Sequence, residues 1–158
     1  MLEFVDFVST NRLESLEGDS SWSVISITDP GTSIARVSPK FGALLRLSFD
    51  DLDQDALQAG CAGQQIGLRE FQQLMVWLEG RHSDPDTRGV LIQCEAGRSR
   101  SAAFAIFISG LYGAQFVERR RIDGFNRLLL SILETVTRRS VGRPGNWMVT
   151  RGEVIGRL

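Results

Sequence analysis

The residues best suited to chemistry lie in the stretch QCEAGRSRS, residues 93–101, which holds one of the two cysteines of the chain. Cys94 comes shortly after the apolar run GVLI, and Arg100 follows six positions later, after a loop that contains Gly97. A loop from a strand to a helix can curl its backbone N–H groups around one phosphate, and glycine permits the backbone angles that this requires. The spacing therefore predicts a phosphate-binding loop with a cysteine at its centre.

Each residue of this loop has a role in the expected chemistry. The planar guanidinium of Arg100 can hold two phosphoryl oxygens, and the N-terminus of the following helix adds partial positive charge. The positive charge of Arg100 and of the helix N-terminus also favours the thiolate of Cys94, which is the form of cysteine that attacks phosphorus. The Ser101 hydroxyl can hydrogen-bond the sulfur and help it to leave from the intermediate. The expected phosphate-binding residues are Glu95, Ala96, Gly97, Arg98, Ser99 and Arg100.

The stretch Cys94–Ser101 resembles the C-x5-R-[ST] loop of cysteine-dependent protein tyrosine phosphatases, and its GxSRS ending is similar to the dual-specificity branch. The stretches VISITDPG, LLRLSFDDL and FNRLLLSIL resemble small bacterial members of the family in order and spacing, so the likeness covers residues 22–137. The resemblance implies a phosphoric monoester hydrolase with a phosphocysteine intermediate and no metal or other cofactor. It also implies a phosphorylated substrate, either a phosphoprotein or a small phosphate ester.

The resemblance further implies an aspartic acid that protonates the leaving oxygen and then activates water. The acidic stretch SFDDLDQD lies at the corresponding place, after a predicted strand. Asp51 is the first candidate for this role and Asp50 is the second. Asp53 and Asp55 lie farther from the end of the strand. A solvated acidic turn is the alternative interpretation of this stretch.

Gln93 departs from the family pattern, in which a histidine directly precedes the cysteine. Glutamine can form hydrogen bonds but cannot carry a positive charge, so we expect slower turnover rather than loss of function. A phosphate-binding module without catalysis stays open as the alternative. A sulfurtransferase is a third possibility, against which the pair Arg100–Ser101 after Gly97 argues. Arg98 either favours acidic substrates or is a surface arginine without a role.

The order of the predicted elements indicates an α/β fold. Residues 22–27, 43–49 and 90–93 are short apolar runs typical of strands, and 56–67 is a loop or a broken helix. Apolar residues recur at helical spacing over 68–79, and the Gly, Pro and Asp residues of 80–89 end that helix.

Two further helices complete the predicted fold. One starts after the loop, with Ser101 as its N-cap and Gly113 at its end, and the other spans 125–136. This order favours a compact phosphatase-like domain with a central, mostly parallel sheet of about four to five strands flanked by helices. Ligands of such sheets bind at the carboxyl ends of the strands, which is where Cys94 falls.

Length and composition indicate one domain over residues 1–158, with a core at 22–137 and a C-terminal extension at 138–158. The net charge of −1 and the absence of a long apolar run predict no nucleic-acid partner and no membrane partner. We expect a monomer in the cytoplasm, where a thiol stays reduced.

Three other features of the sequence are expected to have no part in the chemistry. Cys61 is interpreted as a bystander, with a reversible disulfide to Cys94 as the alternative. His82, the single histidine, is expected in a loop and outside the chemistry. The run Arg119–Arg121 is interpreted as a solvated helix end, although it could also flank the mouth of the site. No metal-ligand pattern is present in the sequence.

Overall fold

The computed structural model describes residues 1–117 and 122–139, and these form an α/β domain around one sheet of parallel strands. The order of the strands across the sheet is β3-β2-β4-β1-β5. Their bounds are β1 Phe4–Ser9, β2 Trp22–Thr28, β3 Ala43–Ser48, β4 Gly89–Cys94 and β5 Gln115–Phe116. The predicted fold class is confirmed, and the sheet is fully parallel.

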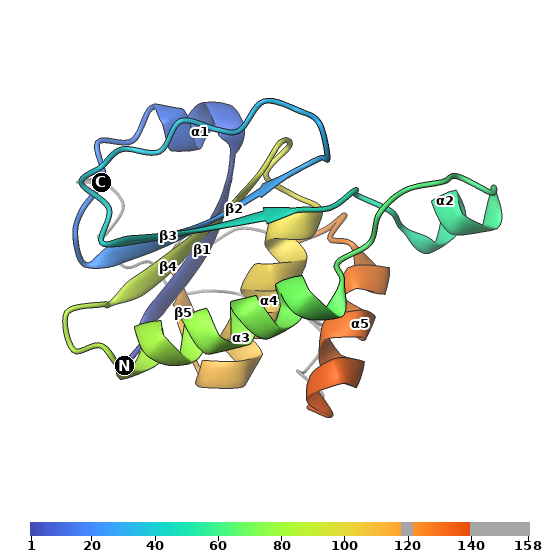
Figure 1. The fold of residues 1–158 in the computed structure, drawn as a ribbon. Helices are drawn as coiled ribbons and strands as arrows, with labels where there is room; N and C mark the ends of the chain where they lie inside the picture. The colour runs from blue at the N-terminus through green and yellow to red at the C-terminus, as the bar shows by residue number, and fades with distance from the viewer. Residues whose placement is uncertain (118–121, 140–158) are drawn as a thin grey trace.

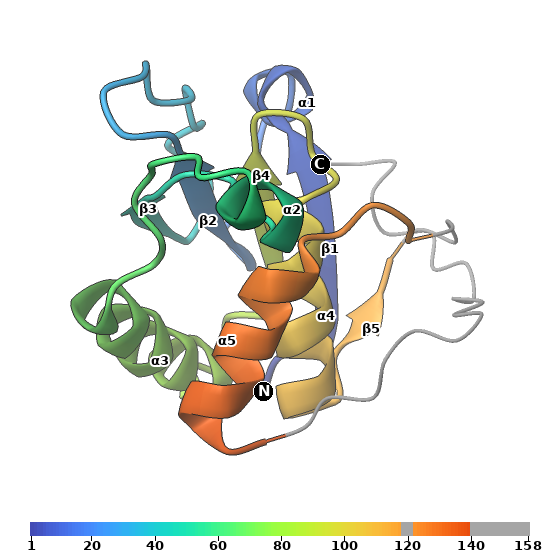
Figure 2. The same cartoon turned by 90° about the vertical axis from the view of Figure 1, so that its right-hand side faces the viewer.

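The helices lie on the two faces of this sheet in unequal number (Figure 1). Helices α3, α4 and α5 cover one face, and α1 lies over the other face. Figure 2 shows α4 and α5 side by side, and Figure 1 shows α2 on an arm that leaves the body of the domain. Their bounds are α1 Thr10–Glu14, α2 Gln54–Gln58, α3 Leu68–Ser83, α4 Arg100–Tyr112 and α5 Arg127–Thr137. No helix in these described ranges is both long and apolar enough to cross a bilayer.

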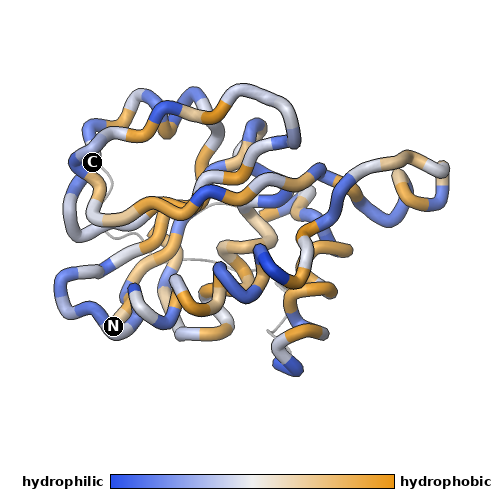
Figure 3. The backbone as a smooth tube through the Cα atoms, in the orientation of Figure 1, coloured by the Kyte–Doolittle hydropathy of each residue, from blue (hydrophilic) through white to orange (hydrophobic). Residues whose placement is uncertain are grey.

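The strands at the centre of the sheet are buried on both faces, as expected for a parallel sheet that is covered on both sides. All six residues of β4 are buried, and so are six of the seven residues of β2. Figure 3 shows the hydrophobic colour running along these strands and along the inner sides of the helices. Residues Arg100 to Ser109 of α4 are all buried, because this helix lies between the sheet and α5. The helix that follows the cysteine loop is therefore the central helix of the domain.

Strand β1 was not predicted from the sequence, and it lies in the middle of the sheet, between β4 and β5. The run FVDFVS is short and contains an aspartic acid, so it lacks the continuous apolar character of a central strand. Asp6 is 1% exposed, and its Oδ1 accepts a hydrogen bond from the backbone of Phe7 at 2.8 Å. Because Val5 and Phe7 belong to the main apolar core, that core begins well before residue 22.

Two predicted helix boundaries are wrong. Helix α3 continues through Ser83 rather than ending near residue 79, so His82 lies in its last turn and not in a loop. His82 stacks on Tyr112 with ring centroids 4.5 Å apart, and its Nδ1 accepts a hydrogen bond from the backbone of Leu2. Helix α4 begins at Arg100 with Ser99 at the N-cap position, so Ser101 is not its N-cap.

Some of the remaining predictions are confirmed, and others concern residues that the structure does not describe. The predicted stop at Gly113 is confirmed, since this residue ends α4 with φ +73°. The helix predicted over 125–136 is α5, and the acidic stretch together with 56–67 contains the short helix α2. The run Arg119–Arg121 and the extension from residue 140 lie outside the described residues.

Candidate active site

The site lies where the carboxyl ends of three neighbouring strands meet. Because the strands are parallel, Ser9 at the end of β1 pairs with Cys94 at the end of β4. On the other side of β4, Ser26 of β2 pairs with Gln93. The chain leaves β4 at this edge, between two strands that precede it by more than sixty residues in the sequence. This is the place at which open α/β sheets bind their ligands.

The loop from β4 to α4 packs directly against the end of β1. Gly97 has φ +64°, and a Cβ atom at this position would lie 2.2 Å from the backbone nitrogen of Ser9. The backbone N–H of Thr10 donates a hydrogen bond to the carbonyl oxygen of Glu95 at 3.2 Å. Glycine is therefore required at position 97 both for its backbone angles and for the close approach of β1.

Cys94 and Ser101 are in contact, as the sequence predicts. The Sγ of Cys94 lies 3.1 Å from the Oγ of Ser101, and the two residues are 1% and 0% exposed. The thiol side chain also contacts the apolar core between the sheet and α4. A hydroxyl that donates to the sulfur stabilises its thiolate, so the contact is suited to a sulfur that both attacks and leaves.

Arg100 is buried at the same edge of the sheet, with its side chain 3% exposed. Its Nη1 donates a hydrogen bond to the carbonyl oxygen of Phe49 at 2.6 Å and lies 2.6 Å from Oδ1 of Asp29. Its Nε lies 3.8 Å from Oδ2 of Asp51 and has no hydrogen-bond partner among the described residues. One side of the guanidinium is thus held by the protein, and the Nε is left with an unused donor.

Of the two candidates for the general acid, the structure brings Asp51 to Arg100. The Oδ1 of Asp51 accepts hydrogen bonds from Oγ of Ser99 and from Nδ2 of Asn126, both at 2.8 Å. Asp50 is engaged elsewhere, because its Oδ2 accepts a hydrogen bond from the backbone of Gln64 at 2.6 Å. Asp51 therefore lies beside Arg100 and Asp50 does not, and the role of Asp51 as the general acid stays a prediction.

Asn126 and Asp29 are site residues that the sequence analysis missed. Asn126 is 4% exposed, caps α5 through a bond from Leu129 N to its Oδ1 at 2.8 Å, and donates from Nδ2 to Asp51. An Asn directly before an amphipathic helix is a recognisable N-cap, but its reach to Asp51 depends on the tertiary fold. Asp29 directly follows β2 in the turn TDPG, and its position after a strand was the only available signal.

The N-terminus of α4 is open, because Ser99 uses its side chain to hold Asp51. Ser99 makes no side-chain capping bond to the helix within the described part of the chain. The first N–H groups of a helix have no partner inside the helix and carry partial positive charge. Together with the Nε of Arg100, which has no hydrogen-bond partner among the described residues, they provide donors for an anion at this edge, where the carboxylates of Asp29 and Asp51 also lie beside the guanidinium.

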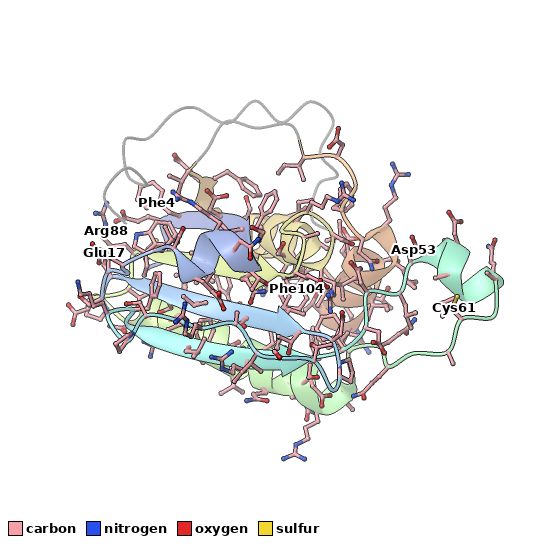
Figure 4. All side chains as sticks on the ribbon, turned by 90° about the horizontal axis from the view of Figure 1, so that it is seen from above. Phe4, Glu17, Asp53, Cys61, Arg88 and Phe104 are labelled. Carbon is pink, nitrogen blue, oxygen red and sulfur yellow. The ribbon has the colours of Figure 1, made fainter. Side chains whose placement is uncertain are left out.

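The side chains of the other predicted loop and arm residues take no part in the side-chain contacts around Cys94, Arg100 and Asp51 that are described above. Glu95, Ala96 and Arg98 are exposed. Cys61 is an exposed free thiol, and Cys94 is a buried one. Figure 4 shows Asp53 and Cys61 on the arm that carries α2, at the outer side of the domain. The Oδ1 of Asp53 accepts a hydrogen bond from the backbone of Ala56, so Asp53 caps α2.

Comparison of the chain with protein-family models, with curated proteins and with solved structures finds no match. The resemblance of residues 94–101 to a phosphatase loop therefore stays a prediction, and the geometry of the site is the basis for a functional proposal. Within the described ranges, no group of three or more His, Cys, Asp or Glu side chains is arranged to hold a metal ion.

Proposed function

We propose that the protein is a phosphoric monoester hydrolase of the cysteine-dependent type, which acts on a protein or small-molecule phosphate ester. The observation that carries this proposal is the unused Nε donor of Arg100, in a side chain that is 3% exposed. A buried guanidinium nitrogen without a partner is costly unless a ligand supplies one. A phosphoryl oxygen is an acceptor that fits a guanidinium donor in the first turn of a helix whose N-cap residue makes no side-chain capping bond.

The proposed reaction has two steps. In the first, the Cys94 thiolate attacks phosphorus, the bond from phosphorus to the ester oxygen breaks, and Asp51 gives its proton to the leaving oxygen. In the second, water attacks the phosphocysteine and Asp51 takes a proton from it, while the hydrogen bond from Ser101 stabilises the departing thiolate. Arg100 and the loop N–H groups hold the phosphoryl oxygens throughout. This chemistry needs a reduced Cys94, which agrees with the expectation of a cytoplasmic protein.

A second candidate is a module that binds a phosphorylated ligand without turnover. Two observations favour it: Cys94 is only 1% exposed, and Gln93 carries no charge beneath the loop. The same cradle would then hold a phosphoryl group by its oxygens without attack by the sulfur. Binding and hydrolysis must therefore be measured separately.

The test is hydrolysis of para-nitrophenyl phosphate by the whole chain, with vanadate as inhibitor. Cys94→Ser should lower kcat by at least about a thousandfold, as loss of a nucleophile does. Cys61→Ser is the matched control, since it removes the exposed thiol on the arm and should leave the rate unchanged. A phosphoryl adduct on Cys94, trapped by acid quenching and found by mass spectrometry, would support the covalent step.

Arg100→Lys tests the cradle itself. Lysine keeps the charge but lacks the planar fork, so kcat/KM should fall about 10- to 100-fold. Hydrolysis that survives Cys94→Ser unchanged would overturn the proposed enzyme. Saturable vanadate binding without hydrolysis in the unmodified chain would favour the binding module instead.

A further inference from the structure

The buried polar side chains beneath the loop form a continuous row across the sheet. Arg46, Ser26 and Gln93 are direct neighbours on β3, β2 and β4, because the strand register pairs Ser26 with both of the others. Paired residues of neighbouring strands project their side chains to the same face of a sheet. This face is the one that α1 covers, opposite to the face on which α4 lies. We call these three residues and Thr10 the polar row.

The hydrogen bonds in the polar row all point in the same direction. Nη1 of Arg46 donates to Oγ of Ser26 at 3.4 Å, and Ser26 Oγ donates to Oε1 of Gln93 at 2.7 Å. Nε2 of Gln93 then donates to Oγ1 of Thr10 at 2.7 Å. Hydrogen bonds that run head to tail polarise one another, and this chain of bonds begins at the permanent cation of Arg46 and ends at Thr10.

Gln93 has no alternative to these partners. It is 0% exposed, its amide oxygen accepts a hydrogen bond from Ser26, and its amide nitrogen donates one to Thr10. Removal of either partner would leave a buried amide group unpaired, which is more costly than the bond itself. The orientation of Gln93 is therefore determined by the hydroxyl groups on its two sides.

Thr10 links the polar row to the cysteine loop by hydrogen bonds. It is the first residue of α1, its side chain accepts the bond from Gln93, and its backbone N–H donates to the carbonyl oxygen of Glu95 at 3.2 Å. Its neighbour Ser9 is the residue against which Gly97 packs. A movement of Thr10 would thus displace two points of the loop: Glu95, directly after Cys94, and Gly97, at the middle of the loop.

We propose that Gln93 and Thr10 are positioning residues for the Cys94 loop, held in place by the hydrogen bonds of the polar row. This inference rests on the proposed function, because it assigns residues that serve the same site. The hydrogen bonds of these four residues go to one another and to the loop backbone rather than to the sulfur, so their effect is on the position of the loop and on the rate of the chemical step.

Thr10→Val removes the hydroxyl and keeps the shape of the side chain. We expect kcat for para-nitrophenyl phosphate to fall about tenfold, with KM within about threefold of its original value. Thr10→Ser, which keeps the hydroxyl, should restore most of kcat. Gln93→Leu should lower kcat at least as much as Thr10→Val, since it breaks both bonds.

Ser26→Ala and Ser23→Ala form a matched pair on β2. Both serines are buried, but the Oγ of Ser23 has no hydrogen-bond partner among the described residues, whereas that of Ser26 belongs to the polar row. Ser26→Ala should lower kcat several-fold and Ser23→Ala should not. Urea unfolding of each variant separates loss of rate from loss of folded protein.

A readout that does not need turnover separates this proposal from the proposed function. Vanadate should protect Cys94 from iodoacetamide, and Thr10→Val should weaken this protection about tenfold. If the unmodified chain shows protection but no hydrolysis, the enzyme proposal fails and the polar row is still tested by protection. Equal effects of Ser26→Ala and Ser23→Ala, or no change of rate and protection in Thr10→Val, would overturn the role of the polar row.

Discussion

Replacement of Gly97 by alanine tests whether the loop is shaped by its contact with β1. Gly97 has φ +64°, and the added Cβ would lie 2.2 Å from Ser9 N and 2.4 Å from the carbonyl carbon of Val8. The left-handed conformation costs an L-residue about 1–2 kcal/mol. The contact with rigid backbone adds about 1–3 kcal/mol, because no side chain can rotate away to relieve it. The expected loss in free energy of unfolding is therefore about 2–5 kcal/mol.

Gly113→Ala is the control for this experiment. Gly113 has φ +73°, but a Cβ at its position would have nothing within 4 Å. This variant should lose only the conformational part, about 1–2 kcal/mol. Urea unfolding followed by tryptophan fluorescence measures both losses on the same chain, and their difference isolates the close approach to β1.

The loop could also relieve the contact by moving away from β1. In that case the stability of Gly97→Ala would approach that of Gly113→Ala, and kcat for para-nitrophenyl phosphate would fall instead, because Arg100 follows the loop directly. The reasoning is refuted if Gly97→Ala matches Gly113→Ala in both unfolding free energy and kcat. Such a result would mean that β1 and the loop are not in contact in solution.

Three further predictions concern the neighbouring residues. With phenyl phosphate, whose leaving group is poor, Asp51→Asn should lower kcat about a hundredfold and Asp50→Asn should not; the reverse result would assign the acid to Asp50. The variant Asn126→Ser keeps a side-chain oxygen that can cap α5, but the serine side chain is too short to reach Asp51. We therefore expect kcat to fall with little change in the midpoint of urea unfolding. A fall in the midpoint without a fall in kcat would show that Asn126 serves only as the cap of α5. Burial raises the pKa of Tyr112, the only tyrosine, above 10.0, so tyrosinate absorbance should appear at higher pH in the folded than in the urea-unfolded chain. The folded state then holds its proton to higher pH, so the contribution of Tyr112 to stability is constant below pH 10 and is lost as the pH rises through the raised pKa of the folded state. Coincident titrations of the folded and unfolded chains would show that the ring is solvated.

The parts of the site that could be predicted from the sequence are those within one continuous stretch. Arg100 and Ser101 follow Cys94 by six and seven positions in the sequence. A tight loop followed by the first turn of a helix brings the three residues to one place. The contact between Cys94 and Ser101 at 3.1 Å follows from this local geometry. The fold class was predictable for a similar reason, since the periodicity of each element is a local property of the sequence.

The parts that could not be predicted depend on the order of strands in the sheet. Asp29 and Asn126 reach Arg100 and Asp51 only because the ends of β2 and β3 and the start of α5 lie at the same edge. Neither residue carries a motif that indicates such a contact. The predicted N-cap of α4, Ser101, is wrong for a related reason. Ser99 occupies the N-cap position, but its hydroxyl donates a hydrogen bond to Asp51, 48 positions away, so a rule based on neighbouring residues does not identify it.

The position of β1 explains why the loop has its shape. A sheet made only of the predicted strands at 22–27, 43–49 and 90–93 would leave one side of the third strand unpaired beside Cys94. In the structure β1 fills that side, so that Thr10 bonds to Gln93 across 83 positions of sequence and Ser9 closes against Gly97. The requirement for glycine at 97 therefore originates in β1, a strand with an aspartic acid at its centre, and not in the loop motif alone. Substitutions at the end of β1 should for this reason lower the rate of Cys94 chemistry, because Ser9 pairs with Cys94 and packs against Gly97.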